Sequence, residues 1–89
     1  MTVRSAKDRL EKRGEVYLDA ELDFRDEKNF AVVITRTGAS RLKEAGINDL
    51  AQHFQEKTIR ATGEVKLVQD VPRIEIEAAD QIRIVQTTP

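Results

Sequence analysis

The feature that most constrains the fold is the segment Thr58 to Val68, in which apolar and polar residues alternate as far as Leu67. Alternation with a period of two is typical of a β-strand that buries one face. Gly63 falls in the middle of the apolar face, where a missing side chain is typical of a sharp bend or a close backbone approach. The segment therefore predicts one long strand in a sheet that curls round on itself. Its apolar face consists of Ile59, Ala61, Gly63, Val65 and Leu67.

A second alternating strand follows a predicted turn over residues 69–72. Arg73 to Glu77 places Ile74 and Ile76 on the buried face. Pairing Leu67 with Ile74 across the turn sets Lys66 opposite Glu75, which is a favourable cross-strand pair. The alternation breaks at residues 78–80 and then resumes, which fits either one long strand with a bulge or two short strands.

Three apolar blocks upstream predict the other strands. They are Met1 to Ala6, Glu15 to Leu22 and Asn29 to Thr35. The second block would carry Asp19, Glu21 and Asp23 on its solvent face beside Tyr17. Residues 7–14 are predicted as a polar loop. The alternative is a helix over Ala6 to Arg13, which would have only Ala6 and Leu10 to bury.

A short helical connection is predicted between the strand blocks. Ala39 to Ala45 is rich in helix-forming residues, with Gly46 in place to end the helix. Asn48 is expected to cap a second turn over Asp49 to His53. The predicted order is thus strand, strand, strand, helix, strand, strand. We expect a single all-β domain over residues 1–89 with one helical connection.

This order, with a glycine in the fourth strand, resembles the OB-fold, a five-stranded Greek-key barrel. The segment Lys57 to Ile76, with its Lys-x-Ile-x-Ala-x-Gly-x-Val run and a turn containing Pro72, is similar to the last two strands of OB-fold nucleic-acid-binding domains, and a late Gln81-Ile82 pair adds to the likeness. Val16 to Ile34 resembles strands two and three of a bacterial subgroup, some members of which are exported. The resemblance implies a five-stranded OB-fold barrel.

The chain departs from that pattern at its beginning, where only Thr2 to Ala6 stands for a first strand that begins earlier in such relatives. A short first strand would leave an unpaired edge, and such edges recruit a protein partner or a second copy. No apolar run follows Met1, so a signal peptide is not predicted and a cytoplasmic location is the default expectation. A truncated N-terminus leaves export of a longer product open.

The resemblance implies a non-catalytic module that binds single-stranded nucleic acid weakly. Such OB-folds combine a basic groove with aromatic rings on which bases stack. Here the implied surface is the outward face of strands two and three, with the loops over residues 7–13 and 69–73. The candidate nucleic-acid-binding residues are Lys7, Arg9, Lys12, Arg13, Tyr17 and Arg73. The acidic residues beside Tyr17 would repel phosphates and oppose this function.

The alternative is a structural or protein-interaction barrel, as part of an exported or envelope assembly. The net charge of −1 and the scarcity of aromatic residues favour this alternative. Enzymatic activity is not predicted, because His53 is the only histidine, cysteine is absent and no nucleophile, phosphate-binding or metal-ligand motif is present. No cofactor, metal ion or membrane insertion is expected.

Overall fold

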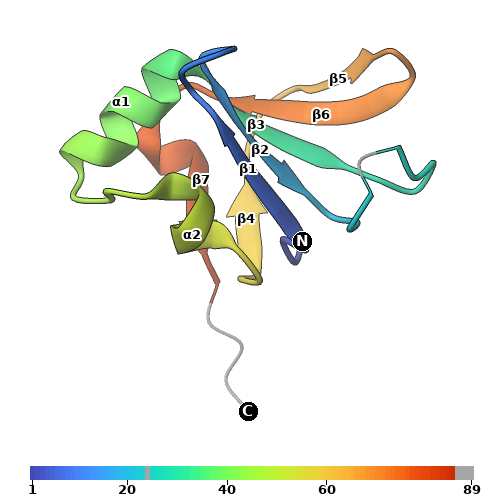
Figure 1. Cartoon of the computed structure of the whole chain (residues 1–89), viewed down its shortest axis with the longest axis horizontal. Coiled ribbons are helices and arrows are strands. Elements are labelled where there is room, and N and C mark those ends of the chain that lie inside the picture. The colour runs from blue at the N-terminus through green and yellow to red at the C-terminus, as the bar shows by residue number, and fades with distance from the viewer. Residues whose placement is uncertain (24, 86–89) are drawn as a thin grey trace.

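A five-stranded sheet forms the centre of the fold in this computed structural model, which describes residues 1–23 and 25–85. In spatial order its strands are β1 (Ser5–Arg9), β2 (Glu15–Asp19), β3 (Ala31–Ile34), β6 (Val71–Ile76) and β5 (Val65–Val68). The first three strands form an antiparallel meander, β3 pairs with β6 in parallel, and β6 and β5 form an antiparallel hairpin (Figure 1). A mostly β domain with a helical connection is therefore observed, as predicted.

A second, two-stranded sheet lies beside the first and contains β4 (Ile59–Ala61) and β7 (Ile82–Ile84). The predicted long strand over residues 58–68 is divided between the two sheets, because the chain leaves the pairing pattern at residues 62–64. A Cβ on Gly63 would lie 3.0 Å from Cγ2 of Ile74, so the predicted close approach at this glycine is confirmed. A short 3-10 helix, Ala79–Gln81, divides β6 from β7 in the same way.

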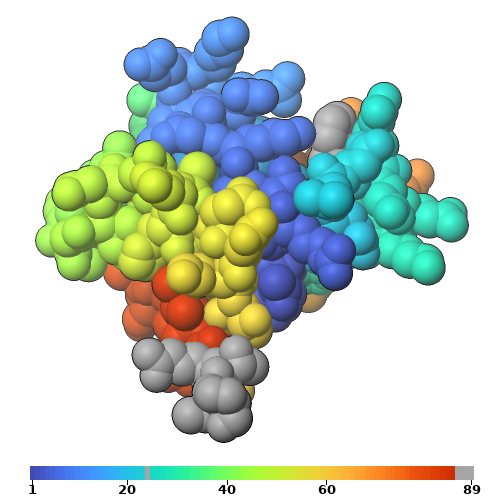
Figure 2. Space-filling view, turned by 60° about the horizontal axis from the view of Figure 1, so that its bottom comes forward, coloured from blue at the N-terminus to red at the C-terminus, as the bar shows by residue number. Residues whose placement is uncertain are grey.

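The expected five-stranded barrel is observed only in part, because the five-stranded sheet is open and does not close on itself. Its edge strands, β1 and β5, do not pair with each other. Closure fails because β4 and β7 pair with one another in a separate sheet instead of extending the larger one. The N-terminal backbone is nevertheless hydrogen-bonded: Val3 N donates to Lys57 O at 2.9 Å, and Ile59 N donates to Met1 O at 2.7 Å. Figure 2 shows this N-terminal segment in dark blue against the yellow segment that contains β4.

Two short helices connect β3 to β4, and side-chain caps fix where each begins. The first, α1 (Arg36–Glu44), begins three residues earlier than predicted because Oγ1 of Thr35 accepts a hydrogen bond from Gly38 N at 3.1 Å. The second, α2 (Leu50–Phe54), is capped by Asp49 rather than by the predicted Asn48. Between them Gly46 has a φ of +103°, which favours glycine and ends α1 as predicted.

The core lies between the helices and one face of the larger sheet. Alternate residues of β2, β3 and β6 point into it, together with residues from both helices. Its largest fully buried side chains are Phe54, Leu18, Ile34, Leu50, Ile76, Val3, Val16 and Val32. Since side chains alternate along a strand, the residues between these positions face the opposite side of the sheet.

The β5–β6 hairpin departs from its predicted packing. Val65 and Leu67, predicted to be buried, are 56 % and 72 % exposed, because β5 is an edge strand that lies away from the helices (Figure 1). The turn contains only Gln69 and Asp70, with φ of +52° and +65°, so the strands continue further than predicted. Val65 rather than Leu67 therefore pairs with Ile74.

Candidate functional site

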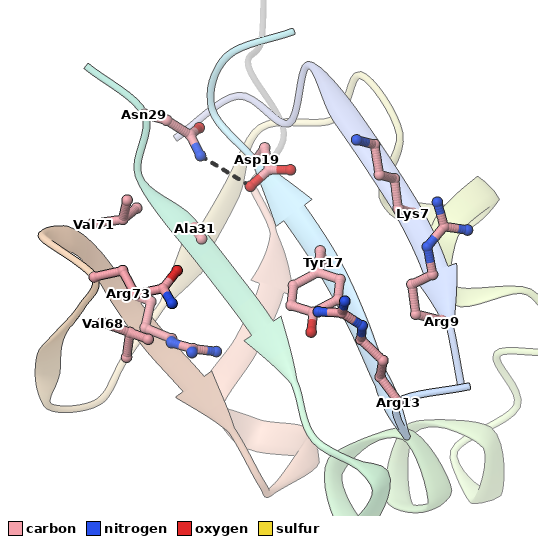
Figure 3. Close-up of a pocket in the computed structure, with 11 residues that line it drawn as sticks. Lys7, Arg9, Arg13, Tyr17, Asp19, Asn29, Ala31, Val68, Val71 and Arg73 are labelled. Carbon is pink, nitrogen blue, oxygen red and sulfur yellow. Dashed lines mark hydrogen bonds between the residues drawn. The ribbon is translucent and has the colours of Figure 1, made fainter. Parts of the chain in front are cut away.

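The sheet face opposite the helices carries a groove of about 390 Å³ (Figure 3). It extends across β1, β2, β3 and β6 and is bounded by the β1–β2 turn and the β5–β6 hairpin. Its lining residues are Lys7, Arg9, Arg13, Tyr17, Asp19, Asn29, Ala31, Val68, Gln69, Val71 and Arg73. Of the six candidate residues named from the sequence, five line this groove. Lys12 lies in the β1–β2 turn and does not line it.

Two of the cationic residues lie on a strand and not in the predicted loop. Lys7 and Arg9 belong to β1, where Lys7 is opposite Tyr17 and Arg9 is opposite Glu15. The strand continues to Arg9 because the chain reverses in a tight turn, in which Gly14 N donates to Arg9 O at 3.0 Å and Gly14 has a φ of +71°. This turn brings Arg13 back over the groove beside the Tyr17 ring (Figure 3).

Tyr17 is held in the middle of the groove by Glu15. Its hydroxyl donates a hydrogen bond to Oε1 of Glu15 at 2.7 Å. The other carboxylate oxygen, Oε2, lies 4.0 Å from Nη1 of Arg73, in a partly exposed ion pair. Burial raises the pKa of the Tyr17 hydroxyl and Glu15 adds to this effect, while the Arg13 guanidinium opposes it. The phenol is therefore protonated at neutral pH, and its ring is fixed between cationic side chains.

Asp19 lies at one end of the groove and is buried, which corrects the prediction that it belongs to a solvated acidic face. Asp19 and Asn29 are 3 % and 2 % exposed. Nδ2 of Asn29 donates to Oδ1 of Asp19 at 3.1 Å, while Oδ1 of Asn29 accepts from Glu21 N at 3.1 Å. Asn29 thus ties the β2–β3 connection down over Asp19. Asp23 lies on the surface of that connection, where Nε of Arg25 is 3.2 Å from its carboxylate.

Burial raises the pKa of the Asp19 carboxyl, although the Asn29 hydrogen bond and the charge of Lys7 partly oppose the shift. The folded state therefore holds this proton more tightly than the unfolded state does. The protonated Asp19 carboxyl stabilises the folded state below pH 3.8, the ordinary pKa of the group, and this contribution is lost as pH rises through the raised pKa of the folded state. At neutral pH the ionised carboxylate therefore destabilises the folded state.

Asp19→Asn is expected to raise the free energy of unfolding at neutral pH, because the amide oxygen still accepts from Asn29 without a buried charge. The gain should shrink as pH falls below 3.8, where both side chains are neutral. Urea unfolding followed by circular dichroism across this pH range measures it. The control is Asp23→Asn: this exposed carboxyl has a pKa lowered by Arg25, so its neutralisation should not stabilise the protein. A less stable Asp19→Asn variant at neutral pH would contradict the sign.

Other residues considered from the sequence lie outside the groove lining. His53 is exposed in the last turn of α2, with its ring 4.8 Å from that of Phe54 in an edge-on contact. Within residues 1–23 and 25–85, no three potential metal-ligating side chains come together. None of the helices in that part of the chain is long and apolar enough to cross a membrane.

Three residues at one end of the groove were not predicted from the sequence: Asn29, Ala31 and Val68. Val71, at the same end, lies within the predicted loop over residues 69–73. The position of Ala31 could have been predicted from the sequence. Val32 and Ile34 were predicted to face the core, so Ala31, next to Val32, is expected on the opposite face of the strand. Val68 could not be identified, since its place depends on the hairpin register.

Comparison of the chain with models of known families, with curated proteins and with solved structures gave no match. The residues of the groove themselves therefore indicate what it can bind. They provide cationic side chains on two sides, an aromatic ring between them, and an apolar end next to a buried carboxylate.

Proposed function

We propose that this chain is a non-catalytic binding module of the OB-fold type, whose groove binds single-stranded nucleic acid weakly. OB-folds are partly open barrels that bind oligonucleotides on the face of strands two and three and on two adjoining loops. Three features support this assignment: the antiparallel β1–β2–β3 meander, the parallel β3–β6 pair and the β5–β6 hairpin. In this assignment β4 and β5 together are the fourth strand, and β6 and β7 are the fifth.

The observation that carries the proposal is the convergence of the cationic residues on Tyr17. Proteins that bind single strands use a basic groove to follow the backbone and aromatic rings to stack bases. Arg9 and Arg13 approach the groove from one side and Arg73 from the other, with the Tyr17 ring between them (Figure 3). A strand of nucleic acid along the groove would stack one base on Tyr17 and place phosphates beside the guanidinium groups.

The affinity should be low for reasons of charge. Glu15 partly neutralises Arg73, and the ionised Asp19 lies near Lys7. The chain as a whole has a net charge of −1, so no broad basic field adds to the attraction. Among the described residues, one aromatic ring lines the groove, and it gives one stacking position that contributes about 1–3 kcal/mol.

An amide NMR titration of labelled protein with mixed-sequence single-stranded DNA and RNA tests this function. We expect shifts to be concentrated at residues 7–17, 29–31 and 68–73, with β7 and α2 unaffected. Affinity should fall with salt, with a log–log slope of about −0.7 for each phosphate contacted. A well-dispersed spectrum that does not change with either nucleic acid would overturn the proposal.

A second candidate function is interaction with another protein through β5. It is favoured by the exposure of Val65, Leu67 and Val68 on this edge strand, since an apolar edge can pair with another strand. The same NMR sample distinguishes the two functions. Broadening at β5 that depends on protein concentration, with no response to nucleic acid, would support interaction in place of nucleic-acid binding.

A further inference from the structure

The outer edge of β5 is the uncovered edge of the five-stranded sheet (Figure 1). Within the described part of the chain no strand pairs with it, and the side chains of Val65 and Leu67 are exposed there. The opposite edge, β1, is partly covered by a residue that follows α2. Ala6 N donates to Oε1 of Gln55 at 2.9 Å, and Nε2 of Gln55 donates to Arg4 O at 2.9 Å. The edge available for pairing with another strand is therefore β5.

The backbone of β5 presents hydrogen-bonding groups to solvent at two positions. The two-residue turn of the hairpin has a positive φ at both residues, which makes Val68 and Val71 a hydrogen-bonded pair. Hydrogen-bonded and non-hydrogen-bonded pairs alternate along antiparallel strands. The N–H and C=O groups of Val65 and Leu67 therefore point outward from the sheet. Pro72 lies opposite Leu67, where its missing N–H costs no bond to β5.

The charges of this segment are complementary to themselves. Glu64 directly precedes β5, and side chains two residues apart share a face of a strand, so Glu64 lies on the same face as Lys66. When two copies of the segment pair antiparallel about Val65, Glu64 of each copy lies opposite Lys66 of the other. This register gives two favourable cross-strand pairs, and it brings the two Val65 side chains together on the opposite face.

The competing registers are unfavourable because of the same charges. Outward-pointing residues have to meet outward-pointing residues, so the register can change only by two residues at a time. Sliding one copy by two residues in either direction places Glu64 or Lys66 opposite itself. Sliding it by four residues toward the turn sets Glu64 opposite Asp70. Like charges directly opposite one another are destabilising, so the register about Val65 is favoured.

We propose that two copies of this chain pair through β5, antiparallel and centred on Val65, and so place two grooves on one side of a continuous sheet. The two-fold axis of such a pair is perpendicular to the sheet, so corresponding faces lie on the same side. Val68 and Gln69 line the groove and directly follow Leu67, so both grooves end beside the axis. The pairing commits the interaction through β5 to a second copy. Its consequence, one nucleic-acid strand held by two grooves, rests on the proposed function.

Two charge reversals test the pairing by sedimentation velocity at low salt. Glu64→Lys and Lys66→Glu each set like charges opposite one another twice, because the interface is symmetric. Each variant alone should self-associate at least about thirtyfold more weakly than wild type. Mixed in equal amounts they should pair with each other, because every contact then joins an acid and a base. The control Glu44→Lys makes the same change of charge at the exposed end of α1 and should self-associate as wild type does.

The wild-type dimer should be weak, because one short strand on each side buries less area than a standard interface. Self-association should nevertheless be detected, together with broadening of the β5 amide signals, below about 1 mM. A wild type that stays monomeric up to that concentration would overturn the proposal, and so would self-association that Glu64→Lys does not weaken. Lys66→Glu also loses its ion pair with Glu75, so if that variant fails to fold, wild type and Glu64→Lys decide the question.

Anisotropy with oligothymidylates tests the two grooves together. A strand of about thirty nucleotides can reach two OB-fold sites, while one of about ten reaches a single site. Wild type should bind the long strand about tenfold more tightly, because copies on one strand meet at a millimolar effective concentration. Glu64→Lys should lose this length dependence and bind the short strand at least as well, since a negative charge is removed.

The two experiments separate failure of the pairing from failure of the proposed function. If wild type binds both oligonucleotides and stays monomeric, the proposed function stands and the pairing fails. If neither oligonucleotide binds to the folded protein, the proposed function fails together with the two-groove consequence, and sedimentation alone decides the pairing. If wild type self-associates without any length dependence, the grooves do not act together and that part of the proposal is overturned.

Discussion

A Gly38→Ala variant is expected to lose about 3 kcal/mol of folding stability or to fail to fold. A Cβ at this position would overlap the backbone carbonyl oxygen of Ile76. That oxygen is fixed, because it accepts hydrogen bonds from the backbone N and from Oγ1 of Thr35, at 3.0 and 3.1 Å. The helix α1 would have to move away from β6. Overpacking of this kind costs about 1–3 kcal/mol, and weakening two hydrogen bonds adds about 1 kcal/mol each.

Urea unfolding followed by circular dichroism measures this effect. The matched control is Ser40→Ala, which adds no atom and lies at an exposed position of the same helix. It should leave stability the same or slightly higher, because alanine favours helix more than serine does. The expected loss of about 3 kcal/mol for Gly38→Ala is a large fraction of the roughly 5–15 kcal/mol by which an ordinary domain is stable. A Gly38→Ala variant as stable as wild type would mean that α1 is not packed on β6 at this distance.

The strands could be predicted from the sequence where the alternating residues are also the buried ones. Whether the sheet closes could not be predicted. Ile74 and Ile76 face the core as their pattern indicates, and Val32 and Ile34 do the same. Alternation assigns faces only within one strand. It does not show where a strand leaves its sheet, and Gly63 marks such a place. Closure depends on which segments pair, which is a property of the whole chain.

The polar site was predictable only in part, because polar residues carry no signal for burial. The cationic candidates were identified by charge and by the resemblance, and five of the six candidates line one groove. Asp19 was assigned to solvent because carboxylates are rarely buried without a partner. Its partner, Asn29, is ten residues away along the chain, across a connection whose path no local pattern indicates.

Replacing Arg9 and Arg13 together with glutamine is expected to weaken binding of single-stranded nucleic acid about thirtyfold. Each exposed ion pair contributes up to about 1 kcal/mol, and the loss of two corresponds to that factor. The salt dependence is a more specific measure. With two phosphate contacts removed, the slope of log affinity against log salt should become shallower by about 1.4. Anisotropy titrations with a mixed-sequence oligonucleotide at several salt concentrations give both quantities.

The control for this variant removes the same charge outside the groove. Lys12→Gln with Arg83→Gln also replaces two cationic residues, one next to Arg13 in the turn and one on β7. Arg83 is opposite Arg60, so its neutralisation removes a like-charge pair and should not harm the fold. If long-range attraction alone drives binding, the two double variants should weaken it equally. If the groove forms the contacts, only the Arg9 and Arg13 variant should change the slope, because counterion release counts phosphates that are contacted directly.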